Sequence, residues 1–112
     1  MDRIAQRTEE LLESIKESEP YLRYSGSLRR LQDRPGVLEK LDRLRRDIFG
    51  IYNTPGNGGF LERADRLQRQ YEELQKIPEV NEFLENEAEL CKRVREINRR
   101  LLTEIVTYIP EI

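Results

Sequence analysis

The sequence predicts an all-α protein with five helices, a central antiparallel helical hairpin and a long C-terminal helix, arranged as an elongated bundle. Apolar residues recur at spacings of three and four along the 112 residues, which is the period of one helix face. Proline and glycine separate these patterns, and no stretch alternates as a strand would. Apolar residues make up 37% and charged residues 38% of the chain. This is a lean supply for a compact core, so we expect a single domain, residues 1–112, with partly shared burial.

The first two helices are expected on either side of Pro20. Residues 2–18 carry one apolar stripe, formed by Ile4, Leu11, Leu12 and Ile15. Ser18 is a suitable N-cap for the second helix, and proline is tolerated in a first helical turn. The second stripe consists of Tyr21, Tyr24, Leu28 and Leu31. Gly26 in its middle costs on the order of 1 kcal/mol, and the helix ends before Pro35.

A glycine-rich turn over residues 53–59 separates two helical patterns of similar length. The stripe before it consists of Val37, Leu41, Leu44, Ile48 and Ile51. The stripe after it consists of Phe60, Ala64, Leu67, Tyr71 and Leu74. Two such patterns around one short loop predict an antiparallel αα-hairpin.

The fifth helix is expected to run from Pro78 to about Ile109, with apolar residues around much of its circumference near the end. Such a helix must be covered on most sides. Residues 79–90 contain five glutamates and no basic residue, whereas basic residues dominate 92–100. An antiparallel copy would set each acidic block against the other's basic block, with a two-fold axis near Cys91. We therefore expect a homodimer or higher homo-oligomer whose interface includes Cys91, Val94, Ile97, Leu101, Leu102, Ile105, Val106 and Tyr108.

The composition excludes several kinds of active site. The chain has no histidine, which removes histidine bases, Ser–His–Asp triads and His-ligated zinc. Its one cysteine, Cys91, forms no intrachain disulfide or Cys-only metal site, and we expect it to be buried as a small apolar residue. A redox or metal role for Cys91 would need ligands from other chains. We predict that the protein is not an enzyme and that it has no catalytic residue and binds no cofactor or metal.

The sequence shows no pattern typical of a membrane or secreted protein. No apolar run approaches the roughly 18 residues of a membrane helix, and the first residues show no signal-peptide pattern. We expect a cytoplasmic protein that does not enter the membrane.

Arginines gather in the middle of the chain, between Arg29 and Arg69. The candidate RNA-binding residues there are Arg43, Arg45, Arg46, Arg63, Arg66 and Arg69. Acidic residues are interleaved, giving salt-bridge spacings such as Asp42–Arg46 and Glu62–Arg66. Aromatic residues placed for base stacking are missing from these clusters. Solvated or protein-facing charge is the favoured interpretation, and direct RNA binding is the alternative.

Residues 15–21, Ile-Lys-Glu-Ser-Glu-Pro-Tyr, resemble the I-x-x-S-x-x-Y opening of the YlbF/YmcA family of small bacterial helical proteins. The similarity continues in residues 77–84, 86–91 and 94–97. The resemblance implies an all-α fold with a helical hairpin, in proteins that associate with themselves or with relatives. It also implies regulation rather than catalysis. Better-known relatives join partner proteins to modulate ribonuclease Y-dependent mRNA processing and, through it, competence, sporulation and biofilm formation.

Larger relatives use additional cysteines to hold iron–sulfur clusters, and this sequence lacks them. The expectation is thus a non-enzymatic regulatory or adaptor protein without a cofactor. Its expected partners are proteins: itself, related family members or a ribonuclease.

Overall fold

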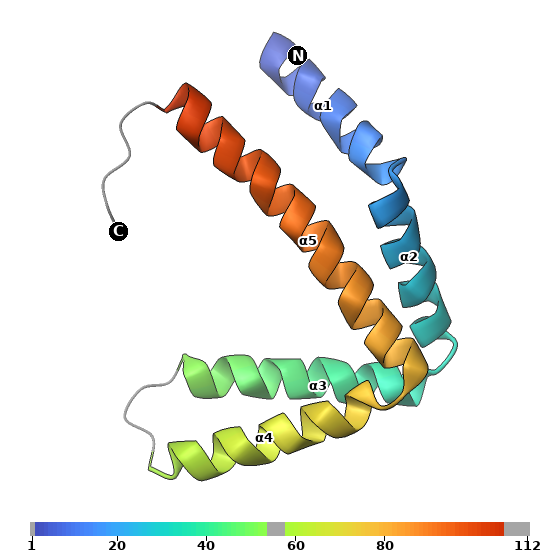
Figure 1. Cartoon of the computed structure of the whole chain (residues 1–112), viewed down its shortest axis with the longest axis vertical. Helices are drawn as coiled ribbons and strands as arrows, with labels where there is room; N and C mark the ends of the chain where they lie inside the picture. The colour runs from blue at the N-terminus through green and yellow to red at the C-terminus, as the bar shows by residue number, and fades with distance from the viewer. Residues whose placement is uncertain (1, 54–57, 107–112) are drawn as a thin grey trace. The chain divides into compact units, whose positions relative to one another are not determined.

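The computed structural model describes residues 2–53 and 58–106. These residues form five α-helices and no strand (Figure 1). The helices are α1 (Arg3–Lys16), α2 (Glu19–Gln32), α3 (Pro35–Tyr52), α4 (Phe60–Gln75) and α5 (Pro78–Ile105). The predicted all-α fold with a long C-terminal helix is confirmed. The expected extension of this helix to Ile109 is too long by at least one residue, since Val106 is not helical, and residues 107–109 lie outside the described part.

Polar and conformationally restricted residues set the helix ends. Asp2 Oδ1 accepts a hydrogen bond from the Ala5 amide at 2.8 Å, which caps α1. Ser18 precedes α2 as expected, but its hydroxyl donates to the Ile15 carbonyl oxygen at 2.5 Å and so closes α1. Pro35 and Pro78 are the first residues of α3 and α5, where a missing amide hydrogen costs nothing.

The chain forms two compact units. We call Gly26–Leu84 the hairpin unit, and Met1–Ser25 together with Glu85–Ile112 the terminal unit.

In the hairpin unit, α3 and α4 pack side by side, which confirms the predicted hairpin (Figure 1). Most of the predicted turn, residues 54–57, lies outside the described residues. Gly59, at the start of α4, adopts φ 77°, a left-handed conformation that glycine takes without steric cost. The buried side chains of this unit come from α2, α3 and α5: Ser27, Leu31, Leu41, Leu44, Val80 and Phe83.

The terminal unit is built differently. The end of α1 and the start of α2 lie against the middle of α5, where Ile15 and Pro20 line a small pocket of about 140 Å³ together with Leu90 and Val94. The Asn86 side-chain amide donates to the Arg23 carbonyl oxygen at 3.3 Å. None of the described residues of this unit is buried. The buried core of the described chain therefore lies entirely in the hairpin unit.

Candidate interaction surfaces

The predicted partner interface on α5 is exposed. Ile105 is 75% accessible to solvent, Ile97 is half-buried, and Tyr108 lies outside the described residues. The other exposed apolar members of the predicted set are Val94, Leu101, Leu102 and Val106. Ile97, Leu101 and Ile105 line one side of a pocket of about 330 Å³ on α5. The last three turns of α5 thus present an apolar surface.

A second part of the terminal unit also exposes apolar side chains. On α1, Ile4 is 80% accessible, and Leu11 and Leu12 are exposed as well. These residues were expected to share one helix stripe, but no interface was predicted for them. Their spacing indicated a shared face, and the structure leaves Ile4, Leu11 and Leu12 of that face exposed, whereas Ile15, its fourth member, is half-buried.

Cys91 is exposed, so the prediction that it is buried is wrong. Its position between Leu90 and Val94 suggested an apolar face. However, the ends of α1 and α2 that lie against this part of α5 cover it only partly: Leu90 is half-buried, and Val94 and Cys91 are exposed. Exposure leaves the thiol accessible to solvent.

The acidic block at the start of α5 is engaged within the chain. Glu82 pairs with Arg30 of α2, and Glu79 Oε2 lies 2.9 Å from Arg34 Nη1. Glu85 and Glu87 also have interaction partners. The charge pattern that suggested an antiparallel α5 pair is therefore partly used by the fold itself.

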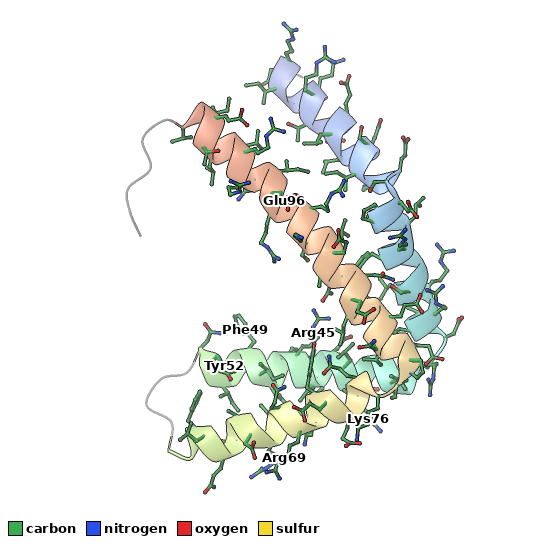
Figure 2. All side chains as sticks on the ribbon, in the orientation of Figure 1. Arg45, Phe49, Tyr52, Arg69, Lys76 and Glu96 are labelled. Carbon is green, nitrogen blue, oxygen red and sulfur yellow. The ribbon has the colours of Figure 1, made fainter. Side chains whose placement is uncertain are left out.

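The six candidate RNA-binding arginines are divided among different surroundings. Arg43 pairs with Glu39 at 3.2 Å, and Arg69 pairs with Asp65 at 2.8 Å. Figure 2 shows the Arg69 side chain extending from α4 away from α3. Arg45 lines a pocket of about 500 Å³. The remaining three, Arg46, Arg63 and Arg66, line a different pocket between α3 and α4.

The predicted ion pairs Asp42–Arg46 and Glu62–Arg66 are not among those that the described residues form. The helices use neighbouring pairs of the same spacing instead, Glu39–Arg43 and Asp65–Arg69. Several carboxylates stand four residues from an arginine on each helix, and spacing alone does not choose between them.

Aromatic side chains occur beside an arginine, which the sequence analysis did not expect. Phe49 and Tyr52, on the last turns of α3, are 69% and 67% accessible (Figure 2). With Tyr71 of α4 they line the same pocket as Arg45. Tyr52 also contacts Phe60 edge to face, with ring centroids 5.5 Å apart. Their spacing of three along α3, off its apolar stripe, was the available signal.

Other kinds of site receive little support in the described part of the chain. Residues 2–53 and 58–106 contain no group of three or more metal-binding side chains, and none of their helices is long and apolar enough to cross a membrane.

Lys76 Nζ donates to Glu73 Oε1 at 2.8 Å, and this hydrogen bond raises the pKa of Lys76 above its usual value. Lys76 therefore stays charged at neutral pH.

Comparison with known proteins identifies the family. Residues 4–106 match the family described as "Control of competence regulator ComK, YlbF/YmcA". No curated protein and no solved structure matches the chain significantly. The match includes residues of all five helices and both compact units. The chain therefore belongs to the YlbF/YmcA family, whose description is one of regulation.

Proposed function

We propose that the protein is a non-enzymatic regulatory adaptor that acts by protein–protein association and self-associates through the terminal unit. The observation that carries this proposal is the contrast in burial between the two units. The hairpin unit has a buried core, whereas the described residues of the terminal unit bury none of their side chains.

The physical argument starts from helix stability. Helices shorter than about 12–15 residues are marginal alone in water, and most of their stability in proteins comes from packing an apolar face. The 14-residue α1 has such a face, but its Ile4, Leu11 and Leu12 remain exposed. The end of α5 exposes a second apolar surface in the same unit. A partner surface would supply the packing that the single chain lacks.

A second copy of the chain is the partner we favour. It brings an identical apolar face, and a two-fold arrangement lets each copy cover the other. The family description supports competence as the regulated process. The resemblance to ribonuclease Y accessory factors extends the proposal to mRNA processing, sporulation and biofilm formation, with a ribonuclease or a family member as further partner.

The test is to place polar groups in the apolar surface of α5. Leu101→Gln/Ile105→Gln changes two exposed positions one helical turn apart. We expect the wild type to sediment as a dimer or larger species at micromolar concentration. The variant should dissociate at least about tenfold more readily, because each lost buried side chain is worth about 1.5–3 kcal/mol.

The matched control is Glu96→Gln/Thr103→Gln. These residues are also exposed, and at 100° per residue they lie about 140–180° around α5 from Leu101 and Ile105 and at least about 60° from Val106, so they face away from the apolar surface. The control should associate as the wild type does. A wild type that is monomeric at micromolar concentration, or equal effects of both variants, would reject self-association through this surface.

A further inference from the structure

Three arginines meet in one pocket of the hairpin unit. Arg46 lies on α3, and Arg63 and Arg66 lie on α4. In an antiparallel hairpin the end of α3 lies beside the start of α4, so these three residues lie at a similar height along the hairpin axis. The pocket has a volume of about 430 Å³ and is also lined by Asp47, Gly50, Ile51 and Leu67.

These arginines differ from their neighbours in having no carboxylate partner. Among the described residues Arg46, Arg63 and Arg66 form no ion pair, whereas Arg43 and Arg69 on the same two helices do. Grouped guanidinium groups repel one another. Asp47 is the one carboxylate that lines the pocket with them, so part of the positive charge is uncompensated, which indicates an anion as the missing partner.

Arg63 is held in place by the backbone. Its Nη2 donates to the Gly58 carbonyl oxygen at 2.8 Å, and its Nε is buried without an acceptor. Arg63 also stands in the first turn of α4, where the helix dipole adds positive partial charge. A fixed guanidinium loses less conformational entropy on binding a ligand than a free one.

The remaining lining residues narrow the ligand class. Three arginines and Asp47 leave the pocket with a net of two positive charges, which matches a phosphomonoester near neutral pH. The Asp47 carboxylate can accept a hydrogen bond from a ligand hydroxyl, and Ile51 and Leu67 offer apolar contact. The volume lies in the range of small-molecule sites, about 300–1,000 Å³.

We propose that this pocket, which we call the arginine pocket, binds a small phosphomonoester that also carries hydroxyl groups, such as a nucleotide or a sugar phosphate. The proposal concerns the hairpin unit and is independent of self-association through the terminal unit.

Isothermal titration calorimetry of the full chain at low salt tests the proposal. The probes are AMP and glucose 6-phosphate, with adenosine and glucose as their controls without phosphate. We expect saturable binding of at least one phosphorylated probe and none of its control. Tighter binding of AMP would assign the nucleotide class, and tighter binding of glucose 6-phosphate the sugar phosphates.

Two double variants separate the pocket from general surface charge. Arg46→Ala/Arg66→Ala should weaken binding by about tenfold or more, since charge-assisted contacts are lost. Arg43→Ala/Arg69→Ala removes the same charge from the same helices outside the pocket and should leave affinity within about twofold. Equal weakening by both pairs would overturn the proposal.

A third variant fills the pocket without changing charge. A Cβ at Gly50 would meet nothing within 4 Å, so Gly50→Leu has room at the pocket wall and should also weaken binding by about tenfold. In the wild type, the Arg63 Nε–H resonance should shift when AMP or glucose 6-phosphate is added. No saturable binding, an unmoved Arg63 resonance, or tighter binding of a single-stranded RNA than of either probe would each overturn the proposal.

Discussion

Arg34 and Glu79 stand 45 residues apart in the sequence, and their side chains form an ion pair in the hairpin unit, with Nη1 and Oε2 2.9 Å apart. Arg30 and Glu82 make a second pair of the same kind. Arg30 lies on α2 and Arg34 lies just after it, so both pairs join this part of the chain to the first turns of α5. The acidic start of α5 therefore serves the fold of its own chain, which limits its use in pairing with another copy.

The Arg34–Glu79 pair should contribute little to stability. Both side chains are more than a third exposed, and exposed pairs contribute about 0–1 kcal/mol to the free energy of unfolding. A double-mutant cycle with Arg34→Ala and Glu79→Ala, followed by urea unfolding, measures the coupling. A coupling energy well above 1 kcal/mol would show that the pair is shielded from solvent.

Leu41→Ala should destabilise the protein by about 2–5 kcal/mol, because Leu41 is fully buried and its truncation leaves a cavity. Leu61→Ala is the control, since Leu61 is 80% accessible and should change the free energy of unfolding by about 0.5 kcal/mol or less. Urea denaturation followed by circular dichroism measures both. Similar losses in the two variants would mean that the core is not where the structure places it.

Glycines of the hairpin should respond in opposite directions to alanine. Gly59 has φ 77°, so Gly59→Ala places a side chain in a left-handed conformation and should cost about 1 kcal/mol. Gly50 is helical and has open space around a Cβ, so Gly50→Ala should stabilise by roughly 0.5–1 kcal/mol. Thermal unfolding measures both changes. A neutral Gly59→Ala would contradict the left-handed backbone at that residue.

Cys91 offers a direct probe of the register of the proposed dimer. The thiol is exposed, and a two-fold axis near it would bring two copies of Cys91 together. We expect a covalent dimer under mild oxidation, measured on a non-reducing gel. Cys91→Ser is the control and should give none. A species confirmed as a dimer by mass that yields no crosslink would place the axis elsewhere along α5.

The helices were predictable because local chemistry sets their ends. Pro78 begins α5 at the predicted residue, whereas Pro35, which was expected only to end the second helix, is already the first residue of α3. The pairing of α3 with α4 followed from a short glycine-rich connection between two matched stripes. These are features of neighbouring residues, which a sequence displays directly.

The distribution of burial was not predictable in the same way. Apolar residues share one helix face on α1 as they do on α3, yet Leu41 is buried and Leu11 is exposed. Whether a stripe is covered depends on what packs against it from distant parts of the chain. For the same reason Cys91 was wrongly expected to be buried, and the Arg30–Glu82 pair was not foreseen.

The arginine pocket was likewise predictable in part from the sequence. Sequence reasoning collected its three arginines within a larger set of six, because charge density is visible in a sequence. It did not separate the ion-paired Arg43 and Arg69 from Arg46 and Arg66, since that depends on which carboxylate each side chain reaches.

The central claim is that the terminal unit completes its packing against a second copy, and hydrogen exchange at several protein concentrations tests it most directly. On dilution from about 100 to about 0.1 micromolar, amides of α1 and the last three turns of α5 should lose protection, while those around Leu41 in α3 keep theirs. Unchanged, strong protection of α1 at a dilution where the protein sediments as a monomer would contradict the account.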